Sequence, residues 1–227
     1  MSSTNETKTL TLHAHATGPN PFKIGIALES LQLPYTIKMW DFSDDAAHGV
    51  KGSTFLKINE NGRVPALEDP NTGVVSWESG AIINYLRRTY DKAGRFGPRG
   101  PSEQDVVDFE KWEYFLLTTL GPMTGQTNWY RHYNAQANED ALHRYEAQTS
   151  RCYTVLEGQL DKSGGESILK GGVCAVDWHF EPWLRQHEFA GLSLEEYPRV
   201  KKWLEGMKGR KEVQEAYRKI KEAADGS

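Results

Sequence analysis

Residues 61–82, NGRVPALEDPNTGVVSWESGAI, decide the fold. Two short apolar runs, residues 63–67 and 74–77, flank the segment Asp69-Pro70-Asn71-Thr72-Gly73, whose residue types favour a tight turn. The stretch therefore predicts two strands joined by this turn. Pro65 would begin one of them, where a missing N–H is tolerated. Glu78-Ser79-Gly80 then opens a helix.

The segments before this hairpin predict a βαβ unit. Residues 9–17, TLTLHAHAT, alternate apolar and polar side chains, and this period of two indicates a half-buried strand. After the loop 18–21, helical spacing begins at Phe22 and ends at Pro34, and residues 35–42 predict a second strand. With a helical turn at 55–58, the order over the first 90 residues is β-α-β-α-β-β-α, a small mixed sheet of four strands covered by helices.

Residues 91–101, DKAGRFGPRGP, contain three glycines and two prolines and predict a linker. Beyond the linker, only helical patterning is evident. It occupies four segments: 106–120, 138–160, 177–186 and 198–220. The sequence therefore predicts an α/β domain at residues 8–90, a linker at 91–101 and an all-helical domain at 102–224.

Composition excludes several classes of function. The formal net charge of −4 gives no basic footprint for nucleic acid. No apolar run reaches the roughly 18 residues of a membrane span, and the N-terminus is polar and unlike a signal peptide, so we expect a cytoplasmic protein. The two cysteines, Cys152 and Cys174, form no CxxC motif and are too few for a disulfide framework or a thiolate zinc site.

Three motifs in the first domain carry candidate chemistry, and the first is Thr17-Gly18-Pro19-Asn20-Pro21-Phe22-Lys23 at a strand-to-helix junction. A helix N-terminus offers unsatisfied N–H donors and a partial positive charge, which lowers the pKa of a thiol held there. The Asn20 amide could donate to such a sulfur. Alternatively, Asn20 is only a helix cap.

The second motif is Arg63-Val64-Pro65. A cis bond before Pro65 would turn the N–H and C=O of Val64 outward, where they could pair with a peptide ligand. The alternative is an ordinary trans edge proline.

The third motif is Glu78-Ser79. The Ser79 N–H and hydroxyl at a helix start could bind a carboxylate, and Glu78 could pair with an ammonium group, so together they suit an α-amino-acid head group. A plain capped helix with an acidic first turn is the alternative.

In this order and spacing, the motifs resemble the glutathione S-transferase family over residues 9–220. The fungal and bacterial branch with the yeast nitrogen regulator and the nu-class transferases is the most similar. Three segments carry that likeness: Gly18-Pro19-Asn20-x-Phe22-Lys23, Trp77-Glu78-Ser79-Gly80-Ala81-Ile82 and Gly121-Pro122-Met123-x-Gly125-Gln126.

The resemblance implies a thioredoxin-like N-terminal domain that binds glutathione, an all-helical domain that binds a second substrate, and a homodimer. By position, Asn20 would contact the glutathione sulfur, Val64 beside Pro65 would pair with the cysteinyl backbone, and Glu78 and Ser79 would hold the γ-glutamyl group. Arg63 and Lys51 are candidates for the glycyl carboxylate.

The chain departs from the family at the thiol-activating position. It has no Tyr, Ser or Cys there, Gly18 stands where the branch often has a hydroxyl residue, and the nearest hydroxyl belongs to Thr17. Pro21 and Glu60 replace the commoner glycine and proline. The absence of a cysteine near residue 20 argues against a mixed-disulfide mechanism. In the second domain, Cys174-Ala175-Val176-Asp177 matches the family's capping box, with Cys174 as a poor cap.

Aromatic side chains in the second domain predict the acceptor site. We expect some of the following to line an apolar cleft: Trp112, Phe115, Trp129, His132 and Tyr133. His132 or Tyr133 could also act as an acid or orient an acceptor. His13 and His15 share a strand face without a third ligand, so no metal site is predicted.

The expected activity is transfer of glutathione to an apolar electrophile, in detoxification or in tailoring a fungal secondary metabolite. Two alternatives stay open: glutathione-dependent disulfide reduction, and a non-catalytic glutathione-binding regulator. The first strand begins within about ten residues, which leaves no room for the regulator's long Asn-rich extension. We therefore place the enzyme first.

Overall fold

The computed structural model describes residues 7–226 and divides into two compact units. One unit contains the residues up to Lys92 together with those from Lys211 onward, and the other contains Ala93–Arg210.

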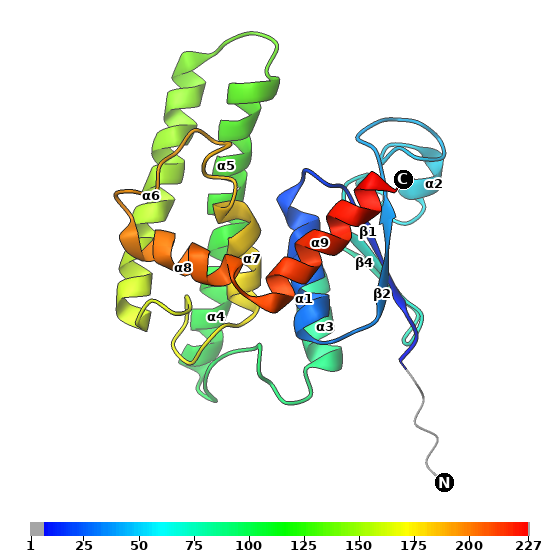
Figure 1. The fold of residues 1–227 in the computed structure, drawn as a ribbon, viewed down its shortest axis with the longest axis horizontal. Helices are drawn as coiled ribbons and strands as arrows, with labels where there is room; N and C mark the ends of the chain where they lie inside the picture. The colour runs from blue at the N-terminus through cyan, green and yellow to red at the C-terminus, as the bar shows by residue number, and fades with distance from the viewer. Residues whose placement is uncertain (1–6, 227) are drawn as a thin grey trace. The chain divides into compact units, whose positions relative to one another are not determined.

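The first unit is built on a four-stranded mixed sheet. Its strands are β1 (Leu10–Ala14), β2 (Tyr35–Met39), β3 (Ala66–Asp69) and β4 (Val74–Trp77). They lie in the order β2-β1-β3-β4, with β1 parallel to β2 and antiparallel to β3, and β3 antiparallel to β4 (Figure 1). The predicted βαβ unit and hairpin are confirmed, although β3 begins at Ala66, after Pro65.

Helices cover the sheet. α1 (Pro19–Ser30) and α3 (Ser79–Tyr90) lie side by side against it, and the short α2 (Ser53–Leu56) lies beyond its other face (Figure 1). α1 begins three residues earlier than predicted, because proline is favoured in the first turn of a helix, where its missing N–H costs nothing.

The C-terminal helix α9 (Lys211–Asp225) belongs to this first unit, where it packs on α1 and β2. Phe22 of α1 and Tyr217 of α9 stack, with 4.2 Å between their ring centroids. A Cβ atom on Gly25 would lie 3.1 Å from the Cβ of Ala216, so two small residues allow the helices to approach closely. α9 lies in sequence within the expected helical domain at 102–224, yet it belongs to the first unit.

An apolar cluster covers the face of the sheet opposite α1 and α3. It consists of Trp40, Val50, Phe55 and Ala66, with three partly buried side chains packed against it: Ile58, Val64 and Trp77. His13 of β1 is 1% exposed, with its ring 5.9 Å from those of Trp40 and Phe55. This cluster supports Val64 and Trp77, which both lie beside candidate site residues.

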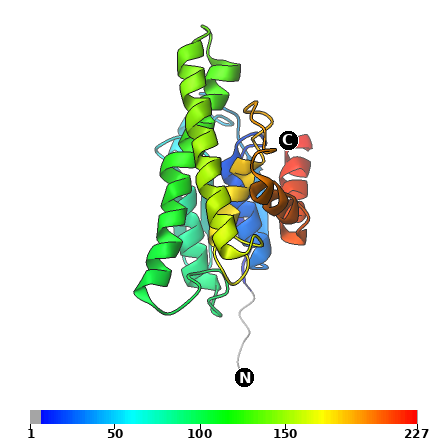
Figure 2. The same cartoon turned by 90° about the vertical axis from the view of Figure 1, so that its left-hand side faces the viewer.

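The second unit is helical, and no residue between 93 and 210, all of which the structure describes, lies in a strand. Four consecutive segments form one helical rod: α4 (Glu103–Phe115), the π-helical turn η1 (Leu116–Leu120), α5 (Gly121–Asn128) and the π-helical turn η2 (Trp129–Tyr133). The long α6 (Glu139–Ser163) runs alongside it (Figure 2). α7 (Ala175–Leu184) and α8 (Pro198–Lys208) complete the unit.

Two sequence predictions about helix boundaries were wrong. Gly121-Pro122 does not break the helical path, because Pro122 falls in the first turn of α5, directly after a π-helical turn with its own bonding pattern. Conversely, the single helix predicted at 198–220 is two helices, α8 and α9, which separate at Gly209-Arg210. Gly209 forms the cap of α8, and α9 then joins the other unit.

The predicted capping box at the start of α7 is present. The Cys174 N–H and the Ile168 N–H each donate to the Asp177 carboxylate at 2.9 Å, and the Trp203 indole N–H donates to it at the same distance. Asp177 is fully buried, so these donors replace the water that its carboxylate gives up.

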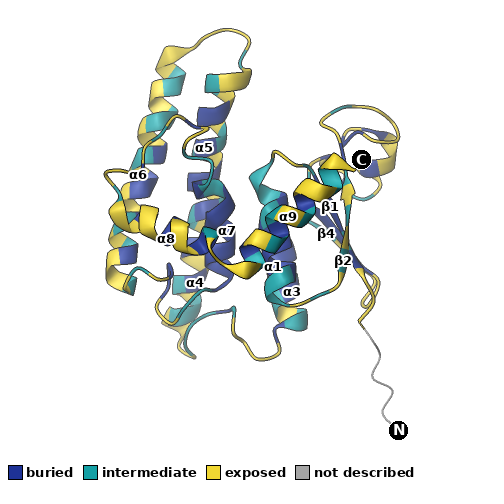
Figure 3. Cartoon of the chain, viewed as in Figure 1, coloured by how far each residue is buried: buried dark blue, intermediate teal, exposed yellow. Residues whose placement is uncertain are grey.

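Burial follows the amphipathic pattern of the helices. α9, for example, has an exposed face and a buried face, and its buried residues are Val213, Ala216 and Ile220 (Figure 3). Within residues 7–226, no helix is both long enough and apolar enough to cross a membrane.

Candidate functional site

Sheet register brings the three predicted motifs of the first unit to one end of the sheet. His13 of β1 pairs with Ala66 of β3, and Ala66 pairs with Trp77 of β4. The segment with Asn20 follows β1, Val64 precedes β3, and Glu78 follows β4. Because β3 is antiparallel to both of its neighbours, its start lies beside the ends of β1 and β4.

The first motif forms the start of α1. Gly18 is the N-cap residue, and it has no side chain that could cap the helix. Asn20 is the second residue inside the helix and is therefore not its cap. Asn20 is partly exposed in the first turn, where backbone donors point toward the end of the helix.

Thr17 is exposed and directs its hydroxyl to His15. Its backbone N–H donates to His15 Nδ1 at 3.1 Å, and its Oγ1 lies 3.0 Å from the same nitrogen. Because Nδ1 accepts the N–H, it carries no proton, and the Thr17 hydroxyl therefore donates to it. Burial, partly opposed by Asp41, lowers the pKa of His15 and favours this neutral ring. In this arrangement, Thr17 has lone pairs but no hydrogen to offer a thiolate.

The sequence of the second motif allowed either a cis or a trans bond between Val64 and Pro65. The Val64–Pro65 bond is cis. Among the described residues, neither the N–H nor the C=O of Val64 has a hydrogen-bond partner. An unpaired donor and acceptor on one residue can add an extended peptide in the manner of a further strand.

The loop before Val64 is held by Asn59, which sequence reasoning missed. Asn59 is 1% exposed; its Nδ2 donates to the Arg63 carbonyl at 2.6 Å, and its Oδ1 accepts the Asn61 N–H at 2.9 Å. Lys51 extends over the same loop and donates to the Asn61 carbonyl at 2.8 Å. The exposed side chain of Arg63 follows directly. Of the two predicted cations, Arg63 therefore belongs to the loop before Val64, and Lys51 is hydrogen-bonded to that loop.

The third motif forms the start of α3. Glu78 is the N-cap residue with φ of 68°, an uncommon value for a residue with a Cβ, and no side chain caps the helix. Ser79 is the first helical residue and is 4% exposed, whereas Glu78 is exposed. The helix N-terminus thus keeps donors for an anion, and a carboxylate for a cation stands beside them.

A lysine that was not predicted to belong to the site lies beneath this helix start. Lys23 of α1 is 1% exposed, and its Nζ donates to Ser79 Oγ at 3.3 Å. The sequence does contain a signal for a buried lysine, because Lys23 lies in a nearly continuous apolar run, Phe22-Lys23-Ile24-Gly25-Ile26-Ala27-Leu28. A charged residue in such a run must either reach solvent or find buried polar partners.

The predicted acceptor residues, all in the second unit, fall into two groups. Trp112 is 8% exposed and packs with Phe115 and Phe180, at 5.5 and 6.2 Å between ring centroids, so it contributes to the core. The second group is on the surface and contains Trp129, His132 and Tyr133. Phe189, which the sequence did not indicate, joins it by stacking on His132 at 4.0 Å.

This surface group, called here the aromatic patch (Trp129, His132, Tyr133 and Phe189), is exposed and held together. Trp129, Tyr133 and Phe189 are 51%, 59% and 44% exposed. His132 Nε2 lies 2.6 Å from the Phe189 carbonyl, which fixes the η2 turn to the segment after α7. The structure therefore separates Trp112 and Phe115 from the other three predicted acceptor residues.

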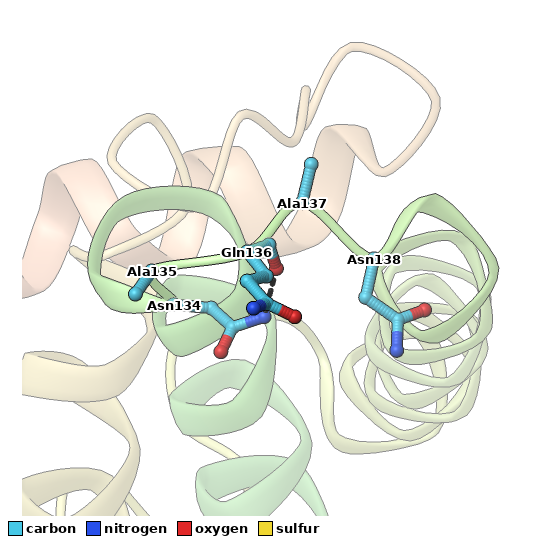
Figure 4. Close-up of a pocket in the computed structure, with 5 residues that line it drawn as sticks. All are labelled: Asn134, Ala135, Gln136, Ala137 and Asn138. Atoms are coloured by element: carbon cyan, nitrogen blue, oxygen red, sulfur yellow. Dashed lines mark hydrogen bonds between the residues drawn. The ribbon is translucent and has the colours of Figure 1, made fainter.

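A pocket of about 350 Å³ follows η2 and is lined by residues 134–138 (Figure 4). Its walls are the amide side chains of Asn134, Gln136 and Asn138 and the methyl groups of Ala135 and Ala137. The Asn134 side chain donates to the Gln136 carbonyl and closes the loop on itself. This polar lining does not match the apolar cleft that the sequence predicted.

Both cysteines are buried in the second unit. Burial raises the pKa of the Cys152 thiol to about 11 and that of the Cys174 thiol to about 12. Neither thiol is therefore ionised at neutral pH. Among the described residues, no group of three or more His, Cys, Asp or Glu side chains could hold a metal ion.

Known proteins are similar to this chain in sequence and in fold. The model of the glutathione S-transferase N-terminal domain matches residues 8–88. The glutathione S-transferase-like protein tpcF of Aspergillus fumigatus is 35% identical, over 87% of this chain and 90% of that protein. The chain belongs to the glutathione S-transferase family.

Further similarity places this family member near Ure2-type proteins. Protein URE2 of Kluyveromyces lactis is 30% identical over 92% of this chain and 61% of that protein. The solved glutathione transferase URE2P6 from Phanerochaete chrysosporium, in complex with oxidised glutathione, superimposes with a TM-score of 0.85 at 33% identity, covering 97% of this chain and 98% of that one. The branch inferred from the sequence motifs and the expected fold class are both confirmed.

Proposed function

We propose that this glutathione S-transferase relative binds glutathione at the end of its sheet and activates the thiol for attack on an apolar electrophile. In conjugation, the thiolate forms a carbon–sulfur bond and the leaving group departs with its electron pair. The protein supplies placement and a lowered thiol pKa.

One observation carries the proposal: within residues 7–226, the backbone N–H and C=O of Val64 are unpaired, at the end of the sheet where the N-cap residue of α3 makes no side-chain cap bond. Glutathione, a γ-glutamyl peptide, can use both features. Its cysteinyl backbone can pair with Val64, and its γ-glutamyl α-carboxylate can bind at the α3 N-terminus. Glu78 suits the ammonium group of the same ligand, and Lys51 and Arg63 are candidates for its glycyl carboxylate.

Thiol activation falls to the start of α1. Asn20 has an amide N–H to donate to a thiolate, and the partial positive charge of the helix start favours the ionised sulfur. Thr17 would have to release His15 before its hydroxyl could donate in the same way. Activation is assigned to Asn20 because it stands in the first turn of α1 and its side chain carries amide N–H groups.

The acceptor is proposed to be apolar and aromatic, in contact with the aromatic patch. Indole and phenol rings contribute flat apolar surface, and offset or edge contacts between rings favour an aromatic partner. Tailoring of a fungal secondary metabolite and detoxification are both proposed as roles, because the two use the same chemistry.

A second candidate activity is glutathione-dependent reduction of a disulfide. The observation that favours it is the oxidised glutathione bound to the similar URE2P6 protein. In this chain, the two cysteines are buried in the protonated form, so both sulfurs of the reductant would come from glutathione.

Calorimetric titration with glutathione, together with the ultraviolet thiolate signal of the bound ligand across pH, tests the proposal. We expect binding and a bound thiolate below pH 8, followed by turnover of an aryl halide. Turnover of a glutathione-containing mixed disulfide alone would favour the second activity. Tight binding without thiolate or turnover would support a non-catalytic binder, and no binding would reject the site.

A further inference from the structure

Lys23 is a charged residue within an otherwise apolar stretch of α1, residues 22–28. It lies in the second turn of α1, is 1% exposed and is among the largest fully buried side chains of the described residues. Its neighbours Ile24, Ile26 and Leu28 are fully buried apolar residues. Burial of an ammonium group costs free energy unless hydrogen bonds and opposite charge compensate for the lost water.

Lys23 is joined to the start of α3 by a hydrogen bond. Its Nζ donates to Ser79 Oγ at 3.3 Å, between residues 56 positions apart in the chain. An ammonium group has three N–H donors and no acceptor, so Ser79 Oγ must be the acceptor of this bond. The Ser79 O–H is therefore directed away from Lys23 and can donate elsewhere.

The charge of Lys23 has the same sign as the end of α3 that it approaches. The N-terminus of a helix carries a partial positive charge, and here no side chain of the N-cap residue compensates it. A buried ammonium group next to a helix start whose N-cap residue makes no side-chain cap bond raises the local positive potential at this corner, which favours a bound anion. A carboxylate is the anion that this corner and the neighbouring Glu78 select together, as part of an amino-acid head group.

We propose that Lys23 is a positioning residue for recognition of the γ-glutamyl α-carboxylate of glutathione. It holds Ser79 so that the serine hydroxyl donates to the carboxylate, and it adds a buried positive charge to the field of the α3 N-terminus. This inference rests on the proposed function. It assigns Lys23 no contact with the thiol.

The test compares glutathione with an analogue in which the γ-glutamyl α-carboxylate is replaced by a carboxamide. Calorimetry on the full chain should show that the wild type prefers the carboxylate by about tenfold or more. Lys23→Met should lose most of this preference, mainly through weaker binding of glutathione itself, whereas the carboxamide should bind almost unchanged. The pKa of the bound thiol should stay the same in the variant.

Two further variants separate positioning from general damage. Lys23→Gln keeps a donor for Ser79 but removes the charge, so it should show an intermediate preference. In Ser79→Ala, the additional change Lys23→Met should cost less than it does alone, because part of its effect passes through Ser79. Lys57→Met, at the exposed end of α2, is the matched control and should keep the full preference.

The outcomes distinguish this inference from the proposed function. If the wild type does not bind glutathione, the proposed function fails and Lys23 has no ligand to position. If the wild type prefers the carboxylate and folded Lys23→Met or Lys23→Gln keeps that preference, only the present inference is overturned. If both variants unfold, the NMR signal of the Lys23 ammonium decides, since it should shift with glutathione and not with the carboxamide.

Discussion

Different residues at the end of the sheet are proposed to bind glutathione and to activate its thiol. Asn20→Ala should raise the pKa of the bound thiol by about one to two units, because a hydrogen bond to a charged group contributes about 1.5–3 kcal/mol. Ser79→Ala should instead weaken binding by about tenfold and leave that pKa unchanged. Ultraviolet titration of the bound thiolate and calorimetry measure the two effects. Equal shifts of thiol pKa in both variants would contradict the division.

His13 predicts a pH dependence of stability. Its Nδ1 accepts the Trp40 indole N–H at 2.9 Å, and its Nε2 donates to Glu68 at 2.8 Å, so the buried ring is neutral. Burial lowers the pKa of His13 below its ordinary value of 6.5, while Glu68 opposes this shift. Below pH 6.5, the unfolded chain therefore binds a proton that the folded chain does not, and stability present above pH 6.5 is lost as pH falls.

His13→Gln should flatten this dependence, because glutamine can accept from Trp40 and donate to Glu68 but does not titrate. Urea unfolding between pH 7.5 and 5.5 measures the difference, which cannot exceed about 1.4 kcal/mol per pH unit for one proton. His143→Gln changes an exposed histidine of α6 and should keep the wild-type pH profile. A wild-type stability that rises on acidification through this range would refute the assignment.

At the scale of elements, the end of α1 has an improvable cap. Gln32 has φ of 56°, with its N–H bonded to the Glu29 carbonyl and the next N–H, of Leu33, bonded to the Leu28 carbonyl. This is a Schellman motif, in which glycine is preferred at the left-handed position. Gln32→Gly should therefore raise the free energy of unfolding by about 1 kcal/mol, whereas Gln32→Ala should bring no gain. Urea unfolding at constant pH compares the two, and an equal gain from alanine would exclude this cause.

The two aromatic groups of the second unit predict opposite phenotypes. Trp112→Ala removes a core side chain and should lower the free energy of unfolding by about 3–5 kcal/mol. Trp129→Ala removes an exposed ring and should change it by less than about 0.5 kcal/mol. If the aromatic patch binds the acceptor, Trp129→Ala should raise the KM for an aryl acceptor without changing that for glutathione. An unchanged acceptor KM would remove Trp129 from the acceptor site.

Sequence patterning was sufficient where the signal is local. Alternation in residues 9–17 predicted β1, and the turn residues 69–73 predicted the hairpin, because strand faces and tight turns depend on neighbouring side chains. Long-range effects were not accessible in this way. The contact of Lys23 with Ser79 and that of Phe189 with His132 join segments 56 and 57 residues apart. The helix break predicted at Pro122 was wrong, because a proline in the first turn of a helix does not interrupt it.

At the scale of the whole molecule, the first unit is assembled from two segments that are far apart in the sequence. The last helix returns to α1 and β2, where Lys219 pairs with Glu29 at 2.5 Å and lies 4.8 Å from the Tyr35 ring. Most of the first unit is made from residues up to Lys92, yet its α1 is covered by a helix that follows the second unit in sequence. Its stability must therefore depend on a segment that is more than one hundred residues distant.

Overpacking the α1–α9 contact tests this dependence. In Ala216→Leu, the larger side chain meets Gly25, and we expect a loss of about 1–3 kcal/mol, while Lys221→Leu on the exposed face should change stability by less than about 0.5 kcal/mol. Hydrogen exchange should accelerate at the amides of α1 and β2 and stay unchanged in the middle of α6, near Tyr153. Faster exchange in α6 with α1 unaffected would show that α9 stabilises the second unit instead.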